Sequence, residues 1–284
     1  MNIFQKIPIL IFFFFIAIGA YIFVYLLKNK FSKERYTNLC QRIKTWLMII
    51  GIFYLGSINK ISMIILFILI SYLSLIEFLK LFDVKRTFGI KMICILIIGI
   101  NYFIIYQNMI YIFYFFIPSI IIFINIFFKK EKIILSLFFS VYFISFISYL
   151  VNIESGILLI LAWIILIELN DVYQYITGNI FGKRRIAPKI SPNKTLEGVV
   201  GGIIMTTATI FFLNTAYGYK INIWMGPIIA ILGFLGDISI SYFKRKANKK
   251  DSGTILAGHG GILDRVDSLI FNSPVILLIT LYLN

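Results

Sequence analysis

Long apolar runs constrain this chain more than any other feature of its sequence. Residues 7–27, 61–79, 133–151 and 156–169 are almost free of charged side chains. At a helical rise of about 1.5 Å per residue, most of these runs can cross a hydrocarbon core of about 30 Å. Inside lipid, only helices and closed barrels satisfy every backbone hydrogen bond. We therefore expect an all-α, polytopic integral membrane protein.

The same pattern predicts about nine or ten transmembrane helices. The apolar content of 60% leaves no room for a separate soluble domain. Because residues 45–58 are short for a span, nine spans with one re-entrant or interfacial element remain an alternative. The expected spans are 7–27, 45–58, 61–79, 92–106, 108–128, 133–151, 156–170, 197–214, 222–243 and 268–283.

The basic residues are distributed unevenly between the two sides of these spans. Of the 27 Lys and Arg residues, all but Lys6, Lys60 and Lys220 fall on one side. The positive-inside rule makes that side cytoplasmic, and the same charges attract anionic membrane lipids. The net charge of +15 therefore reports topology in a multi-pass cell (inner) membrane protein, and we expect no nucleic-acid partner. The expected cytoplasmic loops are 28–44, 80–91, 129–132, 171–196 and 244–267.

The last of these loops, 244–267, holds the densest group of polar residues in the chain. It contains six Lys or Arg, three Asp, four Gly and His259, the only histidine. Basic side chains neutralise phosphoryl oxygens, and Asp binds hard cations. Glycine lets backbone N–H groups approach an anion closely. The loop therefore predicts a site for a phosphate-rich, metal-bridged ligand.

Two carboxylates beside this loop are candidate metal ligands. Asp237 lies about one turn below the cytoplasmic end of its span, where an unpaired carboxylate is costly. Asp264 and Asp267 lie three residues apart at the start of the last span, where the helix dipole favours negative charge. We expect Asp237 and Asp264 to approach each other and to share Mg²⁺ with phosphate oxygens. A structural ion pair with Arg265 is the alternative.

His259 stands in a turn with Gly258, Gly260 and Gly261. These glycines remove steric cover and allow unusual backbone angles, so we expect His259 to face a ligand. A zinc site is not expected, because the chain has one His and its two cysteines are remote.

The other polar segment, 170–202, is expected to be a structured loop rather than a helix. Thr195 precedes the next span and is a candidate N-cap, at a helix end whose free N–H groups can bind an anion. Lys194 lies beside it at the membrane face, and we expect it to be functional. The residues that punctuate the loop are Gly178, Gly182, Pro188 and Pro192.

Three acidic residues lie near the ends of spans. Glu168 and Asp171 are three residues apart and can share one helix face. Either they face a cavity or ligand, or they form a structural ion pair with a loop lysine. Glu77 lies three residues before Lys80, and we expect it to form a snorkelling pair rather than part of a site.

At these residues the chain resembles the phosphatidate cytidylyltransferase, or CDP-diacylglycerol synthase, family. The family signature runs Ser-x-apolar-Lys-Arg, then Lys-Asp, a His-Gly-Gly turn and Asp-Arg-apolar-Asp. The resemblance extends over residues 160–270, whereas the first 150 residues match only as hydrophobic spans. In the signature the matching residues are Ser241, Phe243, Lys244, Arg245, Lys250, Asp251, Gly253, His259, Gly260, Gly261, Asp264, Arg265 and Asp267. In the upstream loop they are Asp171, Tyr175, Gly178, Phe181, Gly182, Lys183, Pro188, Ile190, Ser191, Pro192, Lys194, Thr195, Glu197 and Gly198.

The resemblance implies transfer of CMP from CTP to phosphatidate, which gives CDP-diacylglycerol and pyrophosphate in phospholipid biosynthesis. It implies a homodimer, a polar funnel open to the cytoplasm, and Mg²⁺ with an accompanying K⁺ at Asp237 and Asp264. Residues 151–284 would then be the catalytic region, and residues 1–150 would supply N-terminal transmembrane helices. The implied catalytic residues are Lys244, Arg245, Lys250, His259, Arg265 and Asp267. The implied substrate-binding residues are Asp171, Ser191, Lys194, Thr195, Glu197, Gly260 and Gly261.

Three residues depart from the family pattern: Ala257 replaces Pro or Gly, Leu196 a usual Trp, and Gln174 a usual small residue. The last two lie near the expected lipid entrance, so another phospholipid or a polyprenyl phosphate remains open as the acceptor. A CTP-dependent lipid kinase, which transfers the γ-phosphoryl group, is one alternative function. A carrier for anionic lipids is another, although a carrier needs no paired Asp residues beside a His-Gly-Gly turn.

Overall fold

The computed structural model describes residues 33–85, 87–114, 131–217, 221–255 and 260–282, together with Ile18, Tyr25, Pro118 and Ser119. Within these residues, seven helices are long and apolar enough to cross a membrane. The expected all-α, polytopic membrane fold is therefore confirmed. The elements are α2 (Lys33–Gly56), α3 (Lys60–Leu81), α4 (Phe88–Tyr106), α6 (Glu131–Leu137), η3 (Phe138–Phe143), α7 (Ile144–Ser148), η4 (Tyr149–Asn152), α8 (Gly156–Phe181), β1 (Arg185–Ala187), β2 (Ser191–Thr195), α9 (Leu196–Tyr217), α10 (Met225–Lys246) and α11 (Leu263–Tyr282).

Seven of the predicted spans correspond to these membrane-length helices. α3, α4, α8, α9, α10 and α11 each match one, and the continuous run from α6 to η4 matches another. The predicted span at 45–58 lies in α2, whose apolar part, Leu47–Gly56, is shorter than the other spans. The predicted spans at 7–27 and 108–128 lie mainly outside the described residues.

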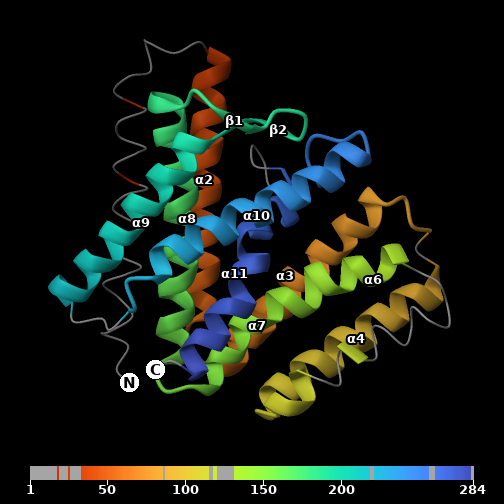
Figure 1. Ribbon diagram of the computed structural model, residues 1–284. Helices are drawn as coiled ribbons and strands as arrows, with labels where there is room; N and C mark the ends of the chain where they lie inside the picture. Colours follow the sequence, from red (N-terminus) through yellow and green to blue (C-terminus); the bar gives the residue numbers. More distant parts are fainter. Residues whose placement is uncertain are drawn as a thin grey trace.

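The helices form an array with α9 at one edge and α4 at the other, and α10 and α11 between them (Figure 1). Buried residues from both sides of position 150 contribute to one hydrophobic cluster. Aromatic rings mark the junction: Phe243 of α10 packs 5.4 Å from Phe78 of α3 and 5.7 Å from Phe139 of η3, between ring centroids. The N-terminal helices therefore contact α10 directly at a signature residue.

The expectation that residues 170–202 form no helix was wrong for the first third of that segment. α8 continues to Phe181, because Gly178 serves as a packing position for α9 rather than as a helix end. A Cβ on Gly198 of α9 would lie only 3.2 Å from the Gly178 Cα, so this close approach requires glycine. Small residues at such spacings are typical of helix contacts in membranes.

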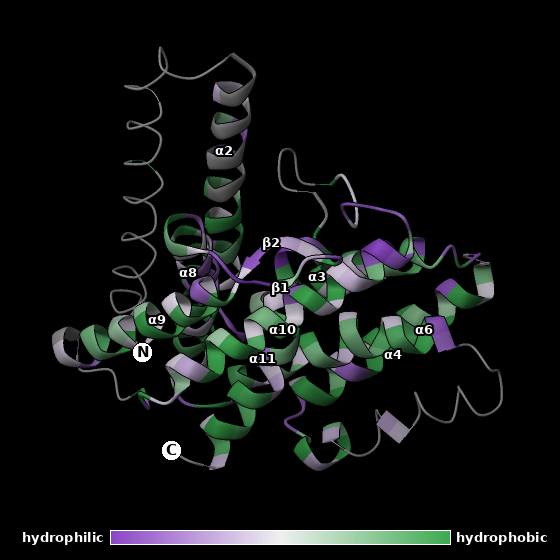
Figure 2. Cartoon of the chain, turned by 45° about the horizontal axis from the view of Figure 1, so that its top comes forward, coloured by the Kyte–Doolittle hydropathy of each residue, from purple (hydrophilic) through white to green (hydrophobic). Residues whose placement is uncertain are grey.

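Residues 185–195 of that segment form an antiparallel hairpin, in which Arg185 pairs with Thr195 and Ala187 with Ser191, and α9 begins directly after it. Figure 2 shows hydrophilic residues gathered around β1 and β2, whereas the helices are mainly hydrophobic. The hairpin therefore brings polar side chains to the ends of α8, α9 and α10.

Candidate active site

A lysine and an aspartate connect the hairpin to α10. The ammonium of Lys194, in β2, lies 2.5 Å from Oδ2 of Asp237. The hydroxyl of Ser241 donates to Oδ1 of the same carboxylate over 3.3 Å. The Lys194 and Asp237 side chains are 20% and 23% exposed. The hairpin thus meets α10 at a contact that a ligand can still reach.

Further carboxylates surround Lys194. Burial by itself lowers the pKa of Lys194, but the charges of Asp237, Asp171 and Asp267 outweigh it, and the pKa lies above its ordinary value. These three carboxylates come from α10, α8 and α11. Lys194 therefore remains an ammonium ion held among acidic groups from three helices.

Asp171 and Asp267 meet at Ser268. The Ser268 hydroxyl donates to Oδ2 of Asp171 over 2.7 Å, and its backbone N–H donates to Oδ1 of Asp267 over 2.9 Å. The other Asp171 oxygen, Oδ1, is buried and has no hydrogen-bond partner among the described residues. Buried carboxylate oxygens normally have a donor, a water or a cation. This oxygen is therefore available to such a group.

Asp264 uses both of its oxygens. Oδ1 lies 2.7 Å from the ammonium of Lys244. Oδ2 accepts from the backbone N–H of Ser252 at 2.8 Å, from the Ser252 hydroxyl at 2.9 Å, and from the N–H of Gly261 at 2.9 Å. Asp264 thus pairs with Lys244 of α10 and also binds two residues, Ser252 and Gly261, of the segment between α10 and α11.

The predicted metal ligands each bind a lysine in this structure: Asp237 binds Lys194, and Asp264 binds Lys244. Across the described part of the chain, no group of three or more His, Cys, Asp and Glu side chains is arranged to hold a metal ion. The carboxylate oxygens near Lys194 are nevertheless the ligand type that Mg²⁺ prefers, and Oδ1 of Asp171 lacks a donor. The shared metal site stays a prediction.

Glu77, which was expected to pair with Lys80, is instead part of this region. Its side chain is buried at the C-terminal end of α3. One carboxylate oxygen accepts from the N–H of Ile262 at 3.1 Å, and the other accepts from the N–H of Leu263 at 2.8 Å and the Ser252 hydroxyl at 3.0 Å. Helix N-termini leave such N–H groups unpaired, and a carboxylate satisfies them. The sequence did contain a signal for this role. Glu77 is an acidic residue within a predicted span, and such residues usually face the interior of the helix bundle and a polar partner.

Glu77 explains two signature glycines. A Cβ on Gly253 would lie 2.4 Å from one carboxylate oxygen of Glu77, and a Cβ on Gly261 would lie 2.3 Å from the other. Both distances are below van der Waals contact, so a side chain at either position displaces the carboxylate. Gly260 has a φ of 83°, which favours glycine for its backbone conformation. His259 lies outside the described residues.

The other predicted cations differ in their surroundings. Lys244 is buried against Asp264. Arg245 donates from Nε to the Ile190 carbonyl over 3.1 Å, which gives the two loops a second connection. Lys250 is exposed. Arg265 lines an apolar cavity together with Glu168.

The upstream loop contains one predicted cap and one structural carboxylate. The Thr195 hydroxyl accepts from the N–H of Gly198 over 3.1 Å, so the predicted N-cap is confirmed. Glu197 accepts from the N–H groups of Lys183 and Arg184, at 3.0 and 3.1 Å, and so fixes the turn after α8. Ser191 begins β2.

The two departures at the expected lipid entrance lie in different surroundings. Gln174 is buried, and its amide donates to the Ala230 carbonyl of α10 over 3.1 Å. Leu196 is exposed at the start of α9. Gln174 therefore serves helix packing, whereas the Leu196 side chain is exposed.

Comparison with known proteins gives consistent matches. Residues 40–283 match the profile described as the cytidylyltransferase family. The uncharacterized protein YnbB of Escherichia coli is 46% identical over 127 residues, which cover 44% of this chain and 43% of YnbB. A phosphatidate cytidylyltransferase of Staphylococcus haemolyticus is 40% identical over 137 residues, 47% of this chain and 53% of the relative. A phosphatidate cytidylyltransferase of Staphylococcus saprophyticus is 42% identical over 127 residues, 43% of this chain and 49% of the relative. The aligned part thus spans about half the length of these relatives.

Proposed function

The chain belongs to the cytidylyltransferase family, and on this basis we propose that it transfers CMP from CTP to phosphatidate, forming CDP-diacylglycerol and pyrophosphate. The observation that carries the proposal is the contact between Lys194 and Asp237, which joins the upstream motif loop to α10, the helix that leads into the second motif loop. Two curated relatives at 40% and 42% identity are named phosphatidate cytidylyltransferases, which supports the same acceptor.

The reaction needs positioning more than acid–base chemistry. A phosphate oxygen of the lipid forms a bond to the α-phosphorus of CTP, and the bond from that phosphorus to the pyrophosphate oxygen breaks. The nucleophile is already an anion, so no strong general base is required. The main barrier is to bring two polyanions together, and fixed cations lower it by orientation and charge stabilisation.

The lysines of the site suit this task because they are already oriented. Lys194 and Lys244 are held by Asp237 and Asp264 at 2.5 and 2.7 Å. Phosphate oxygens compete for the same ammonium groups with charge-assisted hydrogen bonds. Arg245, Lys250 and Arg265 would add positive charge around the nucleotide, and Asp267 would orient Arg265 or bound water.

The carboxylates that the lysines now occupy fit a divalent cation. Asp237 and Asp264 would hold Mg²⁺ once the phosphates draw Lys194 and Lys244 away. Asp171, whose charge also acts on Lys194, belongs to the same acidic cluster. When bound, Mg²⁺ would neutralise charge on the phosphoryl oxygens. The accompanying K⁺ and the homodimer that the family resemblance implies belong to the same proposal.

The proposed site faces the cytoplasm, where CTP is available. The support is the uneven distribution of basic residues, of which only Lys6, Lys60 and Lys220 fall on the other side of the predicted spans.

The proposal is tested with purified protein in detergent, Mg²⁺, phosphatidate and CTP labelled in either the α- or the γ-phosphate. We expect label from the α-phosphate in lipid and label from the γ-phosphate only in released pyrophosphate. Label from the γ-phosphate in lipid would instead identify a kinase. No transfer to any phosphorylated lipid would contradict an enzymatic role and favour a carrier.

A further inference from the structure

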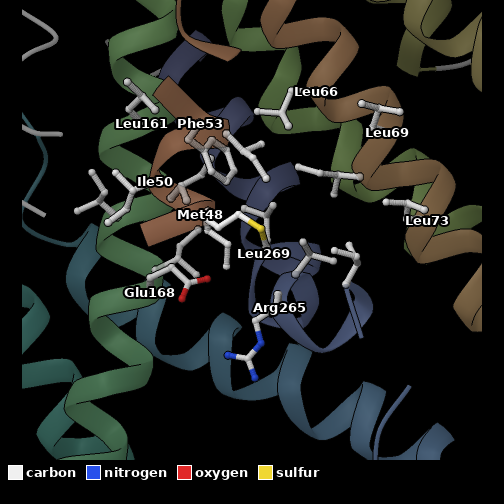
Figure 3. Close-up of a pocket in the computed structure, with 18 residues that line it drawn as sticks. Met48, Ile50, Phe53, Leu66, Leu69, Leu73, Leu161, Glu168, Arg265 and Leu269 are labelled. Atoms are coloured by element: carbon white, nitrogen blue, oxygen red, sulfur yellow. The ribbon is translucent and has the colours of Figure 1, made fainter. Parts of the chain in front are cut away.

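An apolar cavity of about 270 Å³ lies between α2, α3, α8 and α11. All the described residues that line it are apolar except Glu168 and Arg265. Figure 3 shows these two charged residues at one end, with Leu66, Leu69 and Leu161 toward the other. The cavity therefore has the polarity of an amphiphile, with one charged end and a hydrocarbon body.

α11 separates this cavity from the candidate active site. Ile262, Arg265, Val266 and Leu269 line the cavity and follow the spacing of one helix face. Asp264, which alternates with them in sequence, binds Lys244 on α10. Arg265 at the charged end of the cavity is thus the sequence neighbour of Asp264, a carboxylate of the candidate active site.

α8 has the same arrangement. Leu161, Ile164, Ile165 and Glu168 line the cavity. About one turn after Glu168, Asp171 binds Ser268 in the candidate site. On both helices, the cavity ends where the polar site begins.

Part of the cavity wall reaches the surface of the helix array. Leu69 and Ile52 line it and are 52% and 42% exposed. Both belong to apolar helical segments, so a group that enters between them comes from the hydrocarbon layer. In that layer the abundant apolar ligands are acyl chains.

We propose that this cavity binds one acyl chain of the phosphorylated lipid substrate and so places its phosphate at the site. The inference rests on the proposed function for the identity of the lipid. Arg265, beside Glu168 at the charged end, supplies the cation that can meet the phosphate of such a lipid. A volume of 270 Å³ is just below the usual range of ligand pockets, roughly 300–1,000 Å³, which suits one chain rather than a whole lipid.

Photocrosslinking tests the cavity without any need for turnover. The full chain is placed in phosphatidylcholine nanodiscs that contain phosphatidate with a diazirine near the end of one acyl chain. We expect adducts on cavity-lining peptides of α2, α3, α8 and α11, and we expect unlabelled phosphatidate to compete more strongly than added phosphatidylcholine. Equal competition by phosphatidylcholine, or equal labelling of Ile204 and Phe211 on the exposed face of α9, would overturn the proposal.

Matched tryptophan variants provide the second measurement. Leu69→Trp and Ile52→Trp fill the cavity from its exposed wall, whereas Ile204→Trp adds the same side chain at an exposed position of α9 outside it. For both cavity variants we expect adduct yield to fall and KM for phosphatidate to rise about threefold or more, with KM for CTP unchanged. Unchanged adduct yield in both would contradict the proposal. If no variant or wild-type protein transfers CMP, the proposed function fails, and the adduct pattern still decides whether the cavity binds phosphatidate.

Discussion

The ammonium of Lys194 lies 2.5 Å from the carboxylate of Asp237, and this ion pair joins the β1–β2 hairpin to α10. The loop before α9 and the loop after α10 are separate in sequence, and each carries part of the family signature. Because the contact is charged and mostly buried, it fixes the hairpin against α10, the helix that leads into the second loop. Its electrostatics lead to the first prediction.

Lys194→Met should lower the melting temperature in detergent, since it leaves Asp237, Asp171 and Asp267 without their shared cation. The folded-state pKa of Lys194 is raised above 10.5, so the ion-pair contribution is complete below the unfolded pKa and is lost as pH rises through the folded pKa. The difference in melting temperature from wild type should therefore stay constant between about pH 7 and 10 and shrink only above that range. Lys189→Met, at an exposed hairpin position, is the control and should change little. A difference that already disappears near neutral pH would contradict this account.

Asp264→Asn should abolish CMP transfer while the protein still elutes as a folded species in size-exclusion chromatography. Asp237→Asn should behave in the same way, because loss of one anionic ligand weakens metal binding. The double variant should be scarcely worse than either single one, since residues that act as a unit are non-additive. Asp251→Asn, at an exposed residue, is the control and should cost less. If Asp264 serves only to pair with Lys244, residual activity of Asp264→Asn should keep the wild-type dependence on Mg²⁺, and the metal assignment is then wrong.

Glu77→Gln should lower kcat by about tenfold or more, because an amide cannot accept hydrogen bonds on both sides from Ile262, Leu263 and Ser252. The lost bonds loosen the start of α11, so hydrogen exchange at the Leu263 amide should also accelerate. Lys80→Ala distinguishes the alternative: it should leave both measurements unchanged. Equal effects of the two substitutions would mean that Glu77 acts through Lys80.

Gly261→Ala should reduce activity, because its Cβ would lie 2.3 Å from the Glu77 carboxylate. Gly99→Ala is a matched control in α4, where a new Cβ meets no atom within 4 Å. In a Glu77→Ala background, Gly261→Ala should cause a smaller additional loss, since the clash with the carboxylate is removed and only the clash with the Ser252 hydroxyl remains. Additive losses in CMP transfer assays would contradict a clash with Glu77.

The orientation of the loops is tested by cysteine labelling in intact cells, with Cys40 and Cys94 replaced by serine. Cysteines introduced at Ser32 and Lys189 should resist a membrane-impermeant thiol reagent, because both lie on the basic side. A cysteine at Ile58, in the exposed turn between α2 and α3, should react. Labelling of Ser32 or Lys189 from outside would reverse the proposed topology.

Much of the fold was predictable because hydrophobic length is a local property of the sequence. Seven predicted spans match helices, and Thr195 caps α9 as its position before Leu196 indicated. The extension of α8 to Phe181 was missed. In sequence Gly178 indicates a helix end, and only the structure shows that Gly198 of α9 packs against it. Propensity cannot distinguish a glycine that ends a helix from one that packs against its neighbour.

The candidate site was predictable as a set of residues but not as a set of pairs. The sequence predicted a phosphate and metal site at Lys194, Asp237, Lys244 and Asp264, and that assignment stays a prediction. It did not reveal that each aspartate binds one lysine, because side-chain partners from different helices depend on helix rotation and depth. Glu77 was assigned to nearby Lys80, whereas its partner Leu263 lies 186 residues further along the chain.

This distance also has a consequence for assembly in the membrane. α3 enters the bilayer early in synthesis, long before the ribosome has made α11. Until then the Glu77 carboxylate has none of its backbone donors, and an unsatisfied carboxylate at membrane depth is costly. Insertion of the last helix therefore completes two structures in one step, since it adds Asp264 and Asp267 to the site and supplies Glu77 with its donors. The packing of α3 around Glu77 is therefore completed only when α11 has been inserted.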